Sequence, residues 1–189
     1  MGARVAELIA DGQLSIDEAT AVVAQVTTGT LGAIPTLVTH AVVARLQLGD
    51  ETTAAAAIVE EALRHATPFL MVPRTAGAAV SVGGICIEPN ERVGLMVDAA
   101  NRDRTAFADP EAFCPARHDS NGHIAFGLGR HYCLGAALTR VVAEVAVEAA
   151  GSRAGTLTVG PVGHEELFGL RTARSAPVTR MERRRERAS

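Results

Sequence analysis

The stretch Phe126-Gly-Leu-Gly-Arg-His-Tyr-Cys-Leu-Gly135 decides how the rest of the chain is interpreted. It places Cys133 after two glycines, Gly127 and Gly129, and directly before a strongly helical run. Glycine lets the backbone pass close to a flat ligand, where a Cβ would clash. At the start of a helix, free N–H groups and the positive end of the helix dipole stabilise a thiolate. The pattern therefore predicts a sulfur ligand held beneath a flat metal macrocycle.

Other interpretations of this loop have less support. A lone cysteine is most often a small buried hydrophobic residue. A glycine-rich loop before a helix can cradle phosphate, but Gly-Leu-Gly-Arg-His-Tyr is not G-x-G-x-x-G, and no strand–turn–helix unit surrounds it. A zinc site is the third alternative, although its candidate ligands match no common zinc spacing. Those candidates are Cys114, His118, His123, His131 and Cys133.

Composition narrows the class of protein. With 189 residues the chain is long enough to bury a core as one domain. A net charge of -3, 3% aromatic residues and no tryptophan provide neither a basic surface nor stacking platforms, so no nucleic-acid partner is expected. Three cysteines, Cys86, Cys114 and Cys133, form no even-numbered framework. This favours a reduced, cytoplasmic chain in which one cysteine has a special role.

Neither end of the chain suggests targeting. The first ten residues contain an arginine, a glutamate and no long apolar core, so no signal peptide is expected. No run of about 18 apolar residues lacks a polar interruption, so no membrane span or membrane partner is expected. Residues 181–189 form a charge run that two glutamates interrupt, which predicts a solvated charged tail rather than a nucleic-acid arm.

The first long element is an unusual helix. Ser15-Ile-Asp-Glu18 is a capping box, and the helix that it begins is expected to run to about residue 46. Gly29, Gly32 and Pro35 crowd its middle and predict a kink or a locally opened hydrogen-bond ladder. Two causes stay open, namely a ligand or water close to the backbone, or a simple bend between two helices.

The remaining pattern predicts a mainly α chain with small β-sheets, an α+β fold. Further elements are expected in this order: a helix over 51–65, a small hairpin-like sheet over 80–99, a long irregular loop over 101–122, and short strands and turns over 156–180. The clearest helix covers 134–150, with Gly151 as its stop. Its apolar face is expected to consist of Leu134, Leu138, Val141, Val142 and Val145.

A family resemblance emerges from the cysteine loop. Phe126, Gly129, His131, Cys133 and Gly135 resemble, position by position, the haem-binding signature of the cytochrome P450 family, F-x-x-G-x-[RH]-x-C-x-G. The form of the loop is similar to that of the family's soluble bacterial branch. The resemblance implies a haem cofactor whose iron takes Cys133 as its axial thiolate, which in this family favours O–O cleavage. It also implies that His131 contacts a haem propionate.

Other short patterns occur in the order that they have in the family. Glu61-Ala-Leu-Arg64 resembles its E-x-x-R element, and Phe113-Cys-Pro-Ala-Arg117 resembles the segment that supplies a further arginine. The resemblance implies that Glu61, Arg64 and Arg117 form a structural triad that fixes the cysteine loop. Without the resemblance, a solvated ion pair on a helix would be the ordinary interpretation.

Measured against the family, residues 1–180 resemble one partial domain, the C-terminal, haem-binding half of the cytochrome P450 fold. Arg74 resembles the family's arginine that binds a haem propionate, whereas by itself it would be an exposed loop arginine. The half that contributes the substrate lid and much of the pocket roof has no counterpart here. A haem would then lack cover on one face, which weakens its binding.

The helix expected to cross the distal side of the haem departs from the family. A gapless register places A-G-x-[DE]-T over residues 29–33, where Gly32 replaces the acid and Ala33 replaces the threonine. In the family those two side chains deliver protons to dioxygen. Thr28 and Thr30 lie nearby, but helical spacing turns them to other faces. We therefore expect dioxygen activation to be impaired.

The resemblance implies a haem-thiolate oxidoreductase of the monooxygenase type, which oxidises a small organic substrate. Its electrons would come from a separate donor such as a ferredoxin and its reductase, because no flavin or nicotinamide motif occurs in the chain. Peroxide-driven oxidation and the chemistry of a haem-thiolate isomerase or coupling enzyme do not need the proton-delivering pair that is missing here. Both possibilities stay open. The alternative from another class is a truncated, catalytically inactive remnant or haem-binding module.

Overall fold

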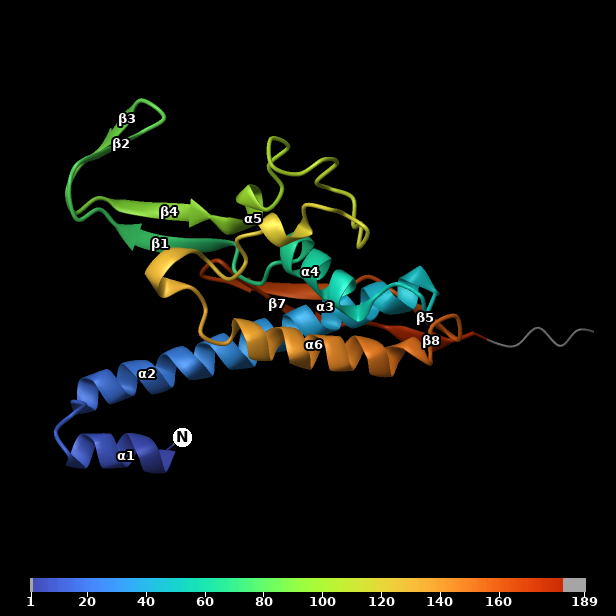
Figure 1. Ribbon diagram of the computed structural model, residues 1–189, viewed down its shortest axis with the longest axis horizontal. Coiled ribbons are helices and arrows are strands. Elements are labelled where there is room, and N and C mark those ends of the chain that lie inside the picture. The colour runs from blue at the N-terminus through green and yellow to red at the C-terminus, as the bar shows by residue number, and fades with distance from the viewer. Residues whose placement is uncertain (1, 182–189) are drawn as a thin grey trace, which may run out of the picture.

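The computed structural model describes residues 2–181 and shows long helices with small two-stranded sheets, which confirms the expected α+β fold (Figure 1). The expected tail lies outside the described residues except for Met181. The helices are α1 (Gly2–Ala10), α2 (Ile16–Thr28), α3 (Ile34–Leu48), α4 (Ala55–His65), α5 (Val97–Ala100) and α6 (Ala136–Gly151). A π-helical turn, η1 (Gly29–Ala33), and two 3-10 turns, η2 (Ser120–Gly122) and η3 (Gly129–His131), complete them.

The expected long helix is present, with the expected interruption. The capping box at its start is confirmed, since the Glu18 backbone N–H donates to Ser15 Oγ at 3.2 Å and the Ser15 N–H donates to Glu18 Oε2 at 2.9 Å. α2 then passes through η1 directly into α3, whose first turn contains Pro35. Proline has no N–H and crowds the preceding turn, and a π-helical turn accommodates this without ending the helix.

By length and composition the continuous helix Ile16–Leu48 could cross a membrane, which was not expected from the sequence. The core helix of a soluble protein meets the same criterion. The second half of this helix, α3, packs against α4 and α6, but only 11% of the helix's most apolar stretch is buried.

The core lies where α3, α4 and α6 meet. Alanines at the contacts allow the helix axes to approach closely, and Ala41, Ala62 and Ala143 are all fully buried. The other buried members of this core are Leu37, Ala44, Ile58, Val59, Leu63 and Val147. α4 begins four residues later than expected and presents Glu61 and Arg64 to the protein interior.

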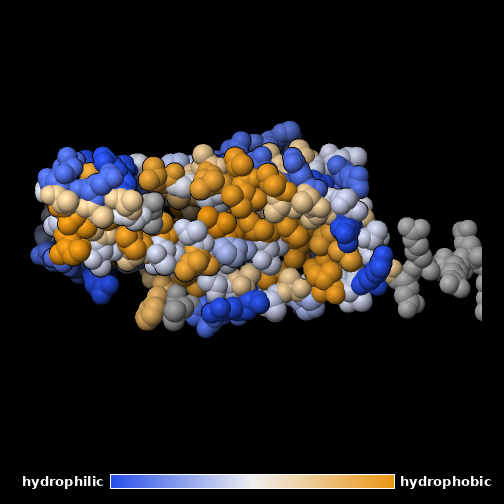
Figure 2. Space-filling model, turned by 90° about the horizontal axis from the view of Figure 1, so that it is seen from below, coloured by the Kyte–Doolittle hydropathy of each residue, from blue (hydrophilic) through white to orange (hydrophobic). Residues whose placement is uncertain are grey.

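The apolar face expected over 134–150 is not the side of α6 that packs against the core. Figure 2, which views the molecule from the α6 side of Figure 1, shows a broad apolar area across the middle of this face. Leu134, Leu138, Val141, Val142 and Val145 are 102%, 63%, 56%, 40% and 60% exposed. The buried side of the helix carries Ala136, Thr139, Ala143 and Val147 instead. α6 is apolar on both sides, and the side with smaller residues packs against α3 and α4 because it permits closer contact.

The strands form antiparallel pairs, β1 (Met71–Thr75) with β4 (Arg92–Met96), β2 (Val80–Val82) with β3 (Ile85–Ile87), β5 (Leu157–Val159) with β8 (Val178–Arg180), and β6 (Gly163–Leu167) with β7 (Leu170–Ser175). The expected hairpin over 80–99 is present as β2 and β3, but β4 pairs with β1, which was not expected. Pro73 lies within β1, opposite Gly94 in a two-stranded pair, where an edge position tolerates proline. The segment between α5 and η2 is irregular, as expected.

Candidate functional site

The Cys133 loop turns through two glycines in the left-handed region. Gly127 and Gly129 have φ values of 71° and 73°. A Cβ on either glycine would meet no atom within 4 Å, so the loop borders open space at both positions. The backbone N–H of Cys133 donates to the carbonyl oxygen of Phe126 at 3.0 Å and closes the loop. Side chains at these glycines would strain the backbone, which explains why glycine occupies both positions.

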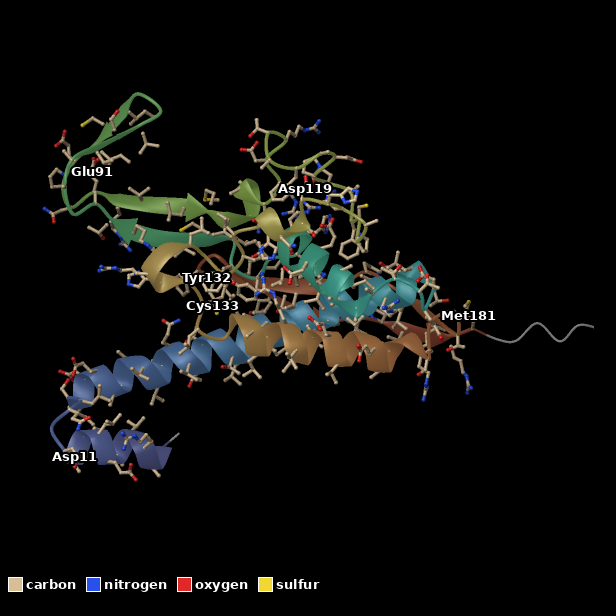
Figure 3. The ribbon with its side chains drawn as sticks, in the orientation of Figure 1. Asp11, Glu91, Asp119, Tyr132, Cys133 and Met181 are labelled. Carbon is tan, nitrogen blue, oxygen red and sulfur yellow. The ribbon has the colours of Figure 1, made fainter. Side chains whose placement is uncertain are left out.

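The thiol of Cys133 lies just before α6. Figure 3 shows Cys133 and Tyr132 where the loop runs down to the start of this helix. Cys133 is half-buried and forms no disulfide. A Cβ added to Gly135 would lie 3.8 Å from Cys133 Sγ, so this glycine keeps the space beside the sulfur free. Within residues 2–181 no three His, Cys, Asp or Glu side chains are grouped to hold a metal ion, which leaves the zinc alternative without support.

The residues of the expected triad lie together in the interior. The side chains of Glu61 and Arg64 are fully buried. Arg64 donates from Nη2 to Glu61 Oε1 at 2.7 Å and from Nε to Glu61 Oε2 at 2.9 Å, a bidentate pair. Arg117 Nε donates to the same Oε1 at 3.4 Å. Charge-assisted bidentate bonds of this kind are the strong ones, and here every charge has a partner.

The triad serves the backbone of the irregular segment that follows α5. The Arg64 guanidinium donates to the carbonyl oxygens of Asn101, Pro110 and Ala112 at 2.9, 2.8 and 3.0 Å. The backbone N–H of Cys114 donates to Glu61 Oε1 at 2.8 Å. This segment has no strand or long helix of its own, so its buried polar groups need such partners. The triad therefore determines the path of this segment, which leads into the cysteine loop.

A second charged cluster was missed in the sequence. Glu60 accepts hydrogen bonds from Arg140 Nε at 2.5 Å, from Arg140 Nη2 at 3.2 Å and from His123 Nε2 at 3.0 Å. Burial would raise the pKa of the Glu60 carboxyl, but the hydrogen bonds from His123 and Arg140 outweigh it and lower this pKa to about 2. The same hydrogen bond to Glu60 raises the pKa of Arg140. We name Glu60, His123 and Arg140 the Glu60 cluster.

The Glu60 cluster is attached to the cysteine loop through an aromatic ring. The Arg140 guanidinium carbon lies 4.7 Å from the centre of the Phe126 ring, a cation–π contact. The ring of Tyr132 meets that of Phe126 edge-on, with 6.2 Å between ring centres. Because the Phe126 carbonyl also accepts from Cys133, the cluster links α4 and α6 to both ends of the loop. In the sequence, only the two consecutive acids Glu60 and Glu61 in α4 indicated a second charged group beside the triad.

Comparison with known proteins identifies the family. Residues 50–149 match the family model described as Cytochrome P450. The chain belongs to the cytochrome P450 family. It is 35% identical over 136 residues to the biotin biosynthesis cytochrome P450 of Bacillus subtilis (strain 168), covering 71% of this chain and 34% of that protein. It is 43% identical over 104 residues to erythromycin C-12 hydroxylase of Saccharopolyspora erythraea, covering 54% of this chain and 26% of that protein.

Solved cytochrome P450 structures share the architecture. Cytochrome P450 CREJ in complex with (4-ethylphenyl) dihydrogen phosphate superimposes with a TM-score of 0.84 and 25% identity, covering 96% of this chain and 48% of that chain. P450BioI in complex with hexadec-9Z-enoic acid ligated acyl carrier protein gives a TM-score of 0.69 and 33% identity, covering 76% and 39%. This chain thus spans less than half the length of these cytochromes P450.

The residues around Cys133 fit a haem. In the cytochrome P450 family a cysteine thiolate holds the haem iron, and Cys133, half-buried just before α6, would be the residue to do so here. The open space beside Gly127 and Gly129 gives room for a flat group, and a Cβ at either position would project into that space. The donor set and the shape of the loop are therefore compatible with the cofactor that the family uses.

Neither Arg74 nor His131, the two side chains expected to contact propionates, forms an ion pair within residues 2–181. Arg74 is exposed in β1, and its Nη1 donates to the carbonyl oxygen of Pro73 at 2.8 Å. His131 is exposed in η3. Both side chains lie at the surface, where an anionic group of a ligand could reach them, and their role stays a prediction.

The helix expected to cross the distal side of a haem has no acid–alcohol pair in η1. A Cβ at Gly32 would lie 3.1 Å from Leu170 Cδ2, so β7 lies close to the side on which an acidic side chain would project. The Thr30 hydroxyl donates to the carbonyl oxygen of Val26 at 2.6 Å, within its own helix. Ala33 offers no proton. The side chains of η1 are therefore poorly suited to deliver protons.

Proposed function

We propose that this chain is the haem-thiolate half of a cytochrome P450-type oxidoreductase, in which Cys133 ligates the haem iron. The observation that carries the proposal is the closed loop from Phe126 to Cys133, with its two glycines at positive φ and the open space beside them. Gly129 and Gly135 keep bulk away from the cofactor. His131 and Arg74 bind its propionates.

When bound, the haem supplies the redox chemistry for oxidising a small organic substrate. The chain's own residues bind and orient this cofactor. The triad and the Glu60 cluster keep the loop in place from two sides. The carboxylate of each group is paired with at least one guanidinium. Electrons come from a separate protein such as a ferredoxin with its reductase. We further propose a cytoplasmic protein that binds neither nucleic acid nor membrane, with residues 1–180 as one partial domain.

A second candidate is a haem-binding module without monooxygenase activity. Two observations favour this module. No residue of η1 carries a carboxylate that could deliver protons, and Gly32 lies so close to Leu170 that an acidic side chain would be crowded there. Peroxide-driven oxidation depends less on side chains that deliver protons. The same is true of isomerisation and of coupling chemistry. Comparing turnover of a test substrate with hydrogen peroxide and with ferredoxin, reductase and dioxygen separates these candidates.

One spectrum tests the cofactor assignment. The purified chain is loaded with haem, reduced and exposed to carbon monoxide, and thiolate ligation gives a strongly red-shifted Soret band. We expect this band to vanish in Cys133→Ser and to persist in Cys114→Ser, which removes another half-buried cysteine. Absence of haem uptake, or a red-shifted band that survives Cys133→Ser, would show that the assignment is wrong.

A further inference from the structure

A pair of histidines joins α3 to β6, outside the Cys133 loop. His40 Nε2 and His164 Nε2 lie 2.8 Å apart, and the planes of the two rings differ by only 12°. Two neutral rings at this distance share one proton, because an N–H of one ring can donate only to the lone pair of the other. Within residues 2–181, each Nε2 has its hydrogen-bond partner in the other ring.

The histidine pair borders a cavity of about 440 Å³. The wall of this cavity is mostly apolar, and the described residues that form it include no carboxylate and no thiol. It carries a third imidazole, that of His65, whose Nε2 lies 2.9 Å from the carbonyl oxygen of Glu111. Because one water occupies roughly 30 Å³ of liquid, the cavity leaves room for several waters beside the two rings.

The charges near the pair do not oppose a cation. Burial lowers the pKa of His40 and also that of His164, so both rings are neutral at pH 7.5. Arg171 is the nearest positive charge that affects both rings. Its Nε donates to Glu166 Oε1 at 3.1 Å, so this charge is offset by a carboxylate. The pair is therefore a set of two neutral nitrogen donors beside a cavity.

Two neutral imidazoles side by side are a donor set for a divalent transition-metal ion. Zn–N bonds measure about 2.0–2.1 Å, so two ligands on one tetrahedral or octahedral zinc ion lie about 2.9–3.4 Å apart. The observed distance of 2.8 Å lies just below this range. His164 is exposed, so its ring has the freedom to turn until both lone pairs converge on one point.

We propose that His40 and His164 form a two-histidine zinc site, in which one Zn²⁺ ion takes the place of the shared proton. Neither ring has to lose a proton to the solvent, since the ring that carried it on Nε2 then carries it on Nδ1. No third His, Cys, Asp or Glu completes the group within residues 2–181, so water in the cavity supplies the remaining ligands.

Zinc at this position fastens the β6–β7 hairpin to α3, and β7 lies beside α3 in Figure 1. A single hydrogen bond from the Ala173 backbone N–H to Thr36 Oγ1, at 2.9 Å, also joins these elements. The same hairpin carries Leu170, which lies against Gly32 in η1. Zinc binding would therefore restrict the hairpin that borders η1. This inference does not depend on the haem chemistry proposed above.

Titration of the purified 189-residue chain with Zn²⁺ tests the site. Calorimetry at pH 7.5 compares the unchanged chain with His40→Gln, with His164→Gln and with the control His118→Gln, which removes an exposed histidine of the irregular segment. Loss of a residue that only supports a metal ligand costs about 10–100-fold in affinity, so loss of either proposed ligand should weaken binding at least about tenfold. The control should bind Zn²⁺ as the unchanged chain does.

Hydrogen exchange gives a second measurement that zinc bound elsewhere does not affect. Zn²⁺ should slow exchange of the β6–β7 amides in the unchanged chain and in His118→Gln, but not in His164→Gln. All four proteins keep the three cysteines, so zinc bound by a thiol contributes equally to each. Circular dichroism with a chelator present verifies that the variants fold, as the exposed position of His164 leads us to expect.

Three results would overturn the proposal. The first is that the unchanged chain binds no Zn²⁺ at millimolar concentration. The second is that His164→Gln equals His118→Gln both in affinity and in the slowing of exchange. The third is that His118→Gln weakens binding as much as His164→Gln does, which would assign the zinc to scattered histidines rather than to this pair.

Discussion

The two sides of the Cys133 loop differ in how completely their charged side chains are paired and their apolar side chains are buried. On the side of α4 and α6, the triad and the Glu60 cluster are buried or half-buried, and their charges are paired over short distances. On the side of α2 and η1, valines face outwards and a threonine hydroxyl donates to its own helix. The first side holds the loop through paired charges, whereas the second leaves apolar side chains exposed.

The largest expected effect is on the triad. Arg64→Ala leaves Glu61 as a buried charge with one cation fewer and removes donors from three carbonyls, so we expect a loss of about 3–5 kcal/mol of unfolding free energy. Soluble yield and urea unfolding measure it. The control is Arg4→Ala, which breaks an exposed pair with Glu7 at the same i,i+3 spacing and should change little. Equal stability of both variants would contradict the structural role of the triad.

The Glu60 cluster should give a smaller loss. Arg140→Ala removes a bidentate ion pair and the cation over Phe126, and because Arg140 and Glu60 are partly exposed, we expect about 1–2 kcal/mol. Arg140→Lys keeps the positive charge but not the planar guanidinium that makes two parallel hydrogen bonds. It should therefore recover only part of the stability that Arg140→Ala loses. Hydrogen exchange at the Cys133 amide reports on the loop directly. Unchanged exchange in Arg140→Ala would show that the cluster does not hold the loop.

A pH effect is expected where α3 meets β6. His40 and His164 face each other with their Nε2 atoms 2.8 Å apart, which allows a single proton between them. Burial, together with the charges of His164, Arg171 and His65, lowers the pKa of His40 from 6.5 to about 4. In the unfolded chain the His40 ring takes up the proton that charges it near pH 6.5, whereas in the folded chain it does so only near pH 4. Stability should therefore be highest above pH 6.5 and fall as the pH drops towards 4.

His40→Gln tests this pH dependence, because it removes the titrating ring and retains a polar side chain. Urea midpoints at pH 7.5 and 5 should differ less in the variant than in the unchanged chain. A parallel loss of stability in both proteins would assign the acid sensitivity to other groups.

The smallest expected effect concerns η1. Gly32→Ala gains about 1 kcal/mol in helix propensity, but its Cβ would lie 3.1 Å from Leu170 Cδ2, so the net change should stay below about 1 kcal/mol. Adding Leu170→Ala removes the tighter of two close contacts, leaving Thr172 Cγ2 at 3.3 Å, so a double-mutant cycle should show part of the gain from Gly32→Ala. A cost of several kcal/mol for Gly32→Ala alone would show that β7 cannot move, and that no acid fits there.

Local patterns in the sequence predicted the features whose causes lie within a few residues. The capping box at Ser15, the opened ladder before Pro35 and the glycine-flanked loop around Cys133 each depend on neighbours along the chain. The resemblance of Glu61-Ala-Leu-Arg64 and Phe113–Arg117 to family elements predicted that Glu61, Arg64 and Arg117 meet, although the contact of Glu61 with Arg117 joins residues 56 positions apart.

Only the tertiary structure decided which surfaces meet. A hydrophobic period shows that α6 has an apolar side but not what lies against it, and the side with Ala143 was buried because smaller residues let α3 and α4 approach. The pairing of Glu60 with Arg140 spans 80 positions and depends on the same packing. The sequence by itself thus determined a glycine-flanked cysteine loop and the capped start of the long helix. The packing of three helices determined how that loop is held and which side was left bare.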